Sequence, residues 1–102
     1  MAAQEKVVHL PREVDICMRE QLRAMLSLED CSTLVIDLRG TRYIDGASIG
    51  EIVRARNLAA AAGKHVIVLV NKSSLIVRIF CAVQLFQTLD IRLCEHSQDI
   101  CA

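Results

Sequence analysis

Apolar and polar residues follow two patterns along this chain, one typical of strands and one typical of helices. Short runs rich in Val, Ile and Leu predict strands, and apolar residues that recur every three or four positions predict amphipathic helices. The two kinds of segment alternate. The expected strands are residues 6–10, 33–38, 65–70 and 89–93, and the expected helices are residues 18–26, 48–62 and 75–83.

The residues between these segments fit such an alternation. Asp15 precedes the first helix as a candidate N-cap, and Ser73 and Ser74 do the same for the third. Gly63 follows the second helix and suits a left-handed helix end. Strand–helix–strand repetition predicts an α/β fold with a mostly parallel four-stranded sheet and right-handed crossovers. With three helices for four strands, the helices are expected to pack largely on one face.

Composition and charge narrow the class of protein. The chain has 102 residues, 53% of them apolar and 3% aromatic, so a single domain over residues 1–102 with an aliphatic core is expected. Twelve basic and twelve acidic side chains cancel, and no basic block indicates a nucleic-acid partner. No signal peptide is visible, and the longest apolar runs span about six residues against the roughly 20 that cross a membrane. We therefore expect a cytoplasmic protein without a membrane partner.

The cysteines do not suggest a disulfide framework or a metal site. There are five of them, Cys17, Cys31, Cys81, Cys94 and Cys101, widely spaced and without a C-x-x-C pair. Reduced thiols that act as small apolar residues are expected. The alternative is a thiol redox sensor, which needs an exposed thiol with a lowered pKa.

No catalytic constellation can be assembled from the sequence. His9, His65 and His96 are scattered, and neither a glycine-rich phosphate loop nor a G-x-S-x-G elbow is present. Asp37 and Asp45 lie on different elements, so no carboxylate pair is indicated. We therefore expect a protein that is not an enzyme and that has no cofactor.

The segment from residue 37 to residue 50 is the most informative. A buried strand ends in a polar loop, and small residues then open a helix. The free N–H groups of a helix start favour an anion, and small side chains leave room for a partner surface to dock. The alternative is an ordinary strand-to-helix turn with Asp45 or Gly46 as the cap.

The same segment resembles the STAS family, the anti-sigma factor antagonists and their relatives. The family pattern is a hydrophobic strand, then D-L-S/R-G and D-S-S-G-L-G, then an amphipathic helix that closes at Gly; here it reads VIDLRGTRYIDGASIGEIVRARNLAAAAGKHVIVLV. Upstream, VVHLPREVDI resembles the family's V-x-L-x-G-E-L-D turn, and residues 75–91 resemble its later helix. The resemblance covers nearly the whole chain and implies a STAS-like fold with the first family strand absent or shortened.

The resemblance implies a switch that works by protein binding, in bacterial transcription regulation. Family members bind an anti-sigma factor that is also a serine kinase, and phosphorylation of a Ser at the helix start releases the complex by adding charge and bulk. Glu51 and Arg54 are expected on the exposed side of the helix. The implied contact residues are Asp45, Gly46, Ala47, Ser48, Ile49, Gly50, Glu51 and Arg54.

The chain departs from the family pattern at the phosphorylated position. Ala47 stands where the family has the acceptor Ser, and Ser48 stands where it has Gly. Either the switch is lost and the protein always binds, or Ser48 is a shifted phosphosite, although one step along a helix turns the side chain by roughly 100°. A scaffold or homo-oligomer without a kinase partner, pairing through an exposed strand edge, is the second hypothesis.

Overall fold

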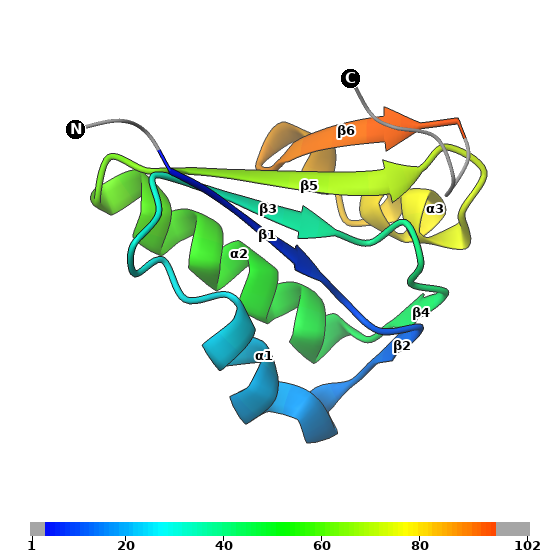
Figure 1. Cartoon of the computed structure of the whole chain (residues 1–102). Coiled ribbons are helices and arrows are strands. Elements are labelled where there is room, and N and C mark those ends of the chain that lie inside the picture. The colour runs from blue at the N-terminus through cyan, green and yellow to red at the C-terminus, as the bar shows by residue number, and fades with distance from the viewer. Residues whose placement is uncertain (1–3, 96–102) are drawn as a thin grey trace.

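A four-stranded sheet forms the centre of the fold in the computed structural model, which describes residues 4–95. All pairings are parallel, in the order β1-β3-β5-β6 (Figure 1). The predicted α/β fold with a four-stranded parallel sheet is therefore confirmed. The strands are β1 (Glu5–His9), β3 (Thr33–Asp37), β5 (His65–Asn71) and β6 (Asp90–Cys94).

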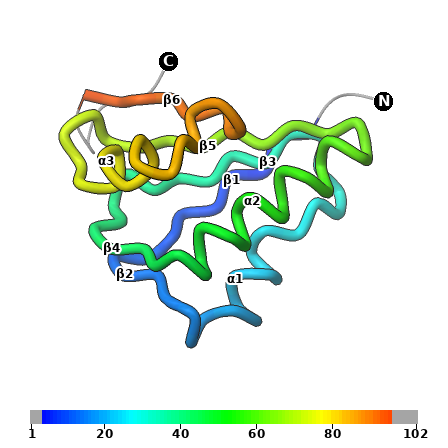
Figure 2. The backbone as a smooth tube through the Cα atoms, turned by 180° about the vertical axis from the view of Figure 1, so that it is seen from behind, coloured from blue at the N-terminus to red at the C-terminus, as the bar shows by residue number. Residues whose placement is uncertain are grey.

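The helices lie together on one face of this sheet (Figures 1 and 2). The described part of the chain contains α1 (Arg19–Met25), α2 (Gly46–Ala61) and α3 (Leu75–Ala82), with short 3-10 turns η1 (Ile16–Met18) and η2 (Leu85–Gln87). Strand order in the sheet follows chain order, so each right-handed crossover brings its helix to the same side. Among residues 4–95, no helix combines the length and apolarity needed to cross a membrane.

Side-chain caps define where the helical segments begin. Asp15 accepts a hydrogen bond from Cys17 N at 2.9 Å, so it caps η1, which then continues into α1. Ser74 caps α3 through Ile76 N at 3.1 Å, as predicted. Gly63 follows α2 with φ 72°, the left-handed conformation that its sequence position indicates.

A second, very small sheet was not expected from the sequence. β2 (Glu13–Val14) pairs in parallel with β4 (Tyr43–Ile44) below the main sheet. Its inward residues Val14 and Ile44 are buried, while the Thr41 hydroxyl donates to the Pro11 carbonyl at 2.8 Å and ties the two segments together. The pairing holds the start of α2 in place, because α2 follows β4 directly.

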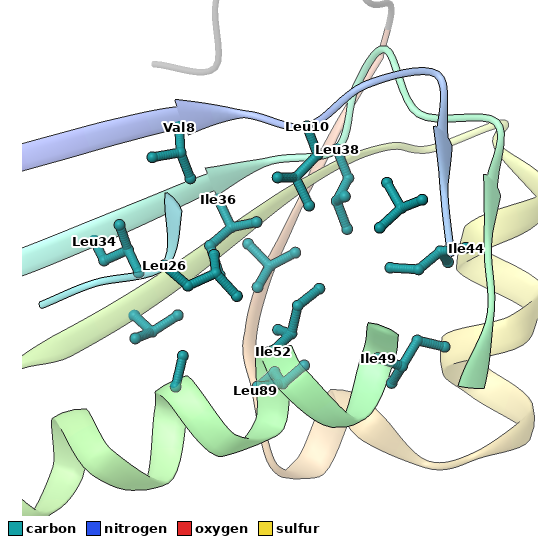
Figure 3. Packing of buried hydrophobic residues seen from close by; sticks show 14 of the residues in the cluster. Val8, Leu10, Leu26, Leu34, Ile36, Leu38, Ile44, Ile49, Ile52 and Leu89 are labelled. Carbon is teal, nitrogen blue, oxygen red and sulfur yellow. The ribbon is translucent and has the colours of Figure 1, made fainter. Parts of the chain in front are cut away.

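The hydrophobic core fills the space between the sheet and the helices (Figure 3). Val8, Ile36 and Val68 lie side by side in register on the helix-facing side and are buried. Leu22 from α1 and Phe80 from α3 are fully buried against this layer. Other members of the core are Leu10, Leu34, Leu38, Ile44, Ile49, Ile52, Val66 and Val70.

The opposite face of the sheet has no helix over it in the described part of the chain (Figure 1). Val35 and Ile67 on this face are buried among neighbouring side chains of the central strands, whereas Val7 on the edge strand is 46% exposed.

The packing of the core predicts that truncating two different positions of α2 lowers the free energy of unfolding by very different amounts. Ile52 is fully buried, whereas Leu58 is 48% exposed. Ile52→Ala is expected to lower the free energy of unfolding by about 2–5 kcal/mol, because it leaves a cavity between α2 and the sheet. Leu58→Ala, the control on the same helix, is expected to cost only about 0.5 kcal/mol. Urea unfolding of both variants measures this, and equal losses would contradict the packing described.

Candidate functional site

Asp45 organises the start of α2. Its backbone is extended (φ −91°, ψ 170°), and one carboxylate oxygen accepts from Ser48 N at 2.8 Å as an N-cap. The other oxygen accepts from Ile16 N at 2.9 Å. One side chain thus binds α2 to the η1 turn, which lies 29 residues earlier in the chain. Of the two caps that the ordinary-turn alternative left open, Asp45 and Gly46, the structure has Asp45, and Gly46 is the first residue of the helix.

The hydrogen bonds around Asp45 favour its charged form. The neighbouring Ser48 hydroxyl and then the Ser48 backbone N–H lower the pKa of the Asp45 carboxyl, with a smaller contribution from Ile16 N. The Ser48 hydroxyl is close to the carboxylate but makes no well-formed hydrogen bond of its own. A carboxylate at the helix start also interacts favourably with the helix dipole.

Small residues at the beginning of α2 leave its surface open. Gly46, Ala47 and Gly50 are exposed. A Cβ placed on Gly46 or Gly50 would meet no atom within 4 Å. Together with the half-buried Asp45, these residues present a low, uncrowded surface at the end of the helix.

Two residues of the expected contact set, Ser48 and Ile49, lie inside the protein instead. Ser48 is 1% exposed and Ile49 is also buried. The expectation that they belong to an exposed contact surface is therefore wrong, because positions 48 and 49 turn toward the sheet when the helix begins at Gly46. A kinase could reach the Ser48 hydroxyl only if the helix start opened.

The expectation that Glu51 lies on the exposed side of α2 is also wrong. It is 8% exposed, and its carboxylate accepts two hydrogen bonds from Arg23, at 2.9 and 3.1 Å, with Arg19 at 3.8 Å. These bonds from Arg23 lower the pKa of the Glu51 carboxyl. The pair joins α1 to α2. Arg54, one turn further along, is exposed as expected.

Two large apolar side chains flank the helix start, and neither was predicted from the sequence as part of the contact surface. Ile16 is 42% exposed and lies beside Asp45 through its backbone hydrogen bond, and Tyr43 is 51% exposed on β4, two residues before Asp45. Exposed aromatic and aliphatic side chains beside small residues are common in protein interfaces. We name this area the α2-start surface; it consists of Ile16, Tyr43, Asp45, Gly46, Ala47 and Gly50.

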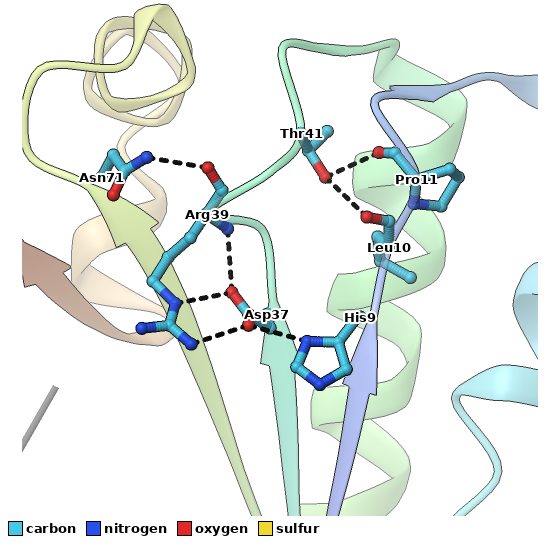
Figure 4. Close-up of polar contacts among 7 residues, drawn as sticks. All are labelled: His9, Leu10, Pro11, Asp37, Arg39, Thr41 and Asn71. Atoms are coloured by element: carbon cyan, nitrogen blue, oxygen red, sulfur yellow. Dashed lines mark hydrogen bonds and ion pairs between the residues drawn. The ribbon is translucent and has the colours of Figure 1, made fainter. Parts of the chain in front are cut away.

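A polar cluster joins the carboxyl ends of β1, β3 and β5 (Figure 4). Buried Asp37 receives two side-chain hydrogen bonds from Arg39, at 3.0 and 2.9 Å, and lies 2.8 Å from His9 Nδ1. Asn71 donates to the Arg39 carbonyl at 2.7 Å. Burial by itself raises the pKa of Asp37, but the bonds and charge of Arg39 outweigh it and lower the pKa overall. This arrangement holds the strand ends together.

Three surface hollows in the described part of the chain are defined by the residues that line them. One of about 370 Å³ lies between α1 and α2 and is lined in part by Arg23, Glu51 and Arg54. Another, of about 430 Å³, lies beside the Arg39–Arg42 turn and the start of α3. A third, of about 160 Å³, is lined in part by His65 and Asp90, whose Nε2 and carboxylate oxygen lie 2.7 Å apart. Within residues 4–95, no group of three or more His, Cys, Asp and Glu side chains could hold a metal ion.

The cysteines differ from the expected reduced state at one position. Cys17, Cys31 and Cys81 are free thiols, but Cys94 is disulfide-bonded. The spacing of cysteines along the sequence does not reveal which of them approach within the roughly 4–7 Å between Cα atoms that a disulfide requires. Cys17 and Cys81 are exposed and Cys31 is buried. Cys101 and His96 lie outside the described residues.

Comparisons with known proteins add no family assignment. No protein-family model matches the chain, and no curated protein matches it. What is established is an α/β fold with a four-stranded parallel sheet, helices on one face and an Asp45-capped helix start.

The double role of Asp45 can be tested by two substitutions. Asp45→Ala removes both the N-cap and the bond to Ile16 N, so it is expected to lower the thermal midpoint. Asp45→Asn keeps one oxygen acceptor, enough for the N-cap bond to Ser48 N but not also for the bond to Ile16 N, and is expected to retain part of the stability. Thermal unfolding followed by circular dichroism compares them. If Asn is as harmful as Ala, the N-cap bond alone contributes little, and the bond to Ile16 N or the charge of Asp45 provides the stabilisation.

Proposed function

We propose that this chain is a regulatory protein-binding module similar to the anti-sigma factor antagonists of the STAS family, and that its α2-start surface docks an anti-sigma factor that is also a serine kinase. The observation that carries the proposal is the helix start itself. Asp45 caps α2, Gly46 and Ala47 are exposed beside it, and nothing in the described residues covers them.

Two features of the surface support binding to another protein. The exposed Ile16 and Tyr43 supply apolar contact area next to a polar rim. The backbone is held by the Asp45 bridge and the β2–β4 pair, so little ordering is needed on binding. The proposed role is non-enzymatic, in bacterial transcription regulation in the cytoplasm.

The contrast between positions 47 and 48 supports a binder without the usual switch. The family's phosphoacceptor position holds the exposed Ala47, which has no hydroxyl, and the neighbouring hydroxyl of Ser48 is 1% exposed. Partner binding would then be constant instead of being released by phosphorylation. The alternative, in which Ser48 is a shifted phosphosite, requires local opening of α2 before every transfer.

A scaffold or oligomer-forming module without a kinase partner is the second candidate function. The specific observation in its favour is that β1 forms an edge of the main sheet and pairs on one side only within the described chain. A protein of this kind would act by presenting its surfaces in more than one copy.

Docking through the α2-start surface is tested by two matched substitutions on one helix. Ala47 and Ala60 are both exposed, near opposite ends of α2. Ala47→Glu places a charged, longer side chain in the proposed contact and is expected to weaken binding at least tenfold, whereas Ala60→Glu is expected to leave it unchanged. The measurement is affinity capture from lysate of the source organism, identification of an anti-sigma factor kinase, and titration of that purified partner.

Two outcomes would contradict docking of an anti-sigma factor kinase on the α2-start surface. Capture of such a kinase with equal affinity by Ala47→Glu would move the contact away from this surface. Failure of the wild-type chain to capture any anti-sigma factor kinase would favour the scaffold candidate. Circular dichroism of both variants checks that the fold is unchanged.

The phosphorylation switch is tested by restoring the missing hydroxyl. Ala47→Ser places a Ser at an exposed position of the helix start, so the captured kinase is expected to phosphorylate it and the complex to dissociate. The wild-type chain, treated with the same kinase and ATP, is expected to remain unmodified by mass spectrometry. Phosphate on Ser48 of the wild type would show that the acceptor is shifted and not lost.

A further inference from the structure

The outer edge of β1 carries a set of unpaired backbone groups. In a parallel ladder, every second residue turns its N–H and C=O toward the neighbouring strand. The Gln4 carbonyl accepts from Thr33 N at 3.2 Å, and Leu10 N donates to the Asp37 carbonyl at 3.1 Å, so the even-numbered residues face β3. The odd-numbered residues Glu5, Val7 and His9 therefore turn their backbone groups outward.

We propose that this edge pairs antiparallel with the same strand of a second copy, about a two-fold axis at Val7. In that register Val7 lies opposite Val7, and Glu5 lies opposite the second copy's His9. Residues that exchange two hydrogen bonds in an antiparallel pair must both face the partner strand, and every opposed residue here does so. The contact is isologous and closes as a dimer.

Neighbouring registers fit less well. A shift by one residue brings outward-facing groups opposite groups that are already bonded to β3, and a shift by two leaves an end residue unpaired and separates Glu5 from His9. Only the register centred on Val7 gives all three outward residues of β1 a partner. The strand is therefore self-complementary in its backbone pattern.

The side chains of β1 are complementary in the same register. Glu5 would face an imidazole, and cross-strand pairs of opposite polarity stabilise a sheet. His9 Nδ1 lies 2.8 Å from the Asp37 carboxylate, so Nε2 is left for this contact and donates to the Glu5 carboxylate when the imidazole is protonated. Val7, 46% exposed, would be covered by its counterpart. Lys6 points to the other face and bonds the Ser27 carbonyl at 3.0 Å, so its charge is held within its own chain.

The dimer would join two four-stranded sheets without using the α2-start surface. Stable interfaces bury more than roughly 1,000 Å² of surface. Pairing of two five-residue strands is expected to bury less than this, so the association is expected to be weak and dependent on concentration. Each dimer would present two α2-start surfaces. The inference does not rest on the proposed function, because β1 contributes no residue to that surface.

A cysteine placed on the two-fold axis tests the register. In a chain with Cys17→Ser and Cys81→Ser, Val7→Cys is expected to form an intermolecular disulfide under mild oxidation, because opposed residues lie about 5.5 Å apart between Cα atoms. Glu5→Cys is the matched control on the same strand and face. Its two copies would lie roughly 13 Å apart along the strands, so it is expected not to cross-link.

Sedimentation equilibrium of the chain without added cysteines tests the association itself. The wild type is expected to rise from one-chain to two-chain mass with concentration, Val7→Thr to behave similarly, and Val7→Lys to stay at one-chain mass because two charges would meet on the axis. A one-chain mass for the wild type up to its solubility limit would overturn the proposal. Equal cross-linking of Glu5→Cys and Val7→Cys would overturn the register.

Discussion

The parallel pairing of four strands in chain order is the constraint on which the rest of this structure depends. Parallel neighbours cannot be joined by a hairpin, so each connection must cross over the sheet. Because every crossover steps in the same direction with the same hand, all the helices are brought to one face. The helix-facing residues of the strands, such as Ile36 and Val68, then form one core with the helices.

The same constraint places the helix start that we propose as a docking surface. α2 begins directly after β4, and β4 is fixed by its pairing with β2 below the carboxyl ends of the main strands. Asp45 then secures this junction with one oxygen on each of two segments. The surface is thus supported by backbone pairing and by a single carboxylate. The exposed side chains of Ile16, Tyr43 and Ala47 take no part in this support.

Much of the fold could be predicted from the sequence, and the exceptions have physical causes. The runs at 33–38 and 65–70 predicted the central strands, and Gly63 marked the end of α2, whereas α2 begins at Gly46, before the predicted start at residue 48. The β2–β4 pair was missed because two-residue strands have no periodicity to detect. Cys94 was misjudged because bonding between thiols depends on distances that sequence spacing does not report.

The burial of Ser48 could have been read from the sequence, whereas that of Glu51 could not. Ser48 precedes Ile52, Ala55 and Ala59 at helical spacing, so it belongs to the stripe that faces the sheet. Glu51 lies at the border of this stripe. Its burial depends on Arg23, which α1 brings to it from 28 residues away. A buried carboxylate without such a cation would be unfavourable, so the contact between α1 and α2, invisible to local pattern, decides its position.

Helix geometry also bears on how the proposed binding would be regulated. Adjacent positions of a helix differ by roughly 100° in direction, so Ala47 and Ser48 are not interchangeable neighbours. At the first turn of α2, one faces solvent and the other faces the core. A Ser at position 48 therefore cannot replace a Ser at position 47 as an acceptor that a kinase can reach. Under the proposed function, the Ala at position 47 removes the acceptor without disturbing the surface around it, which separates partner binding from its release.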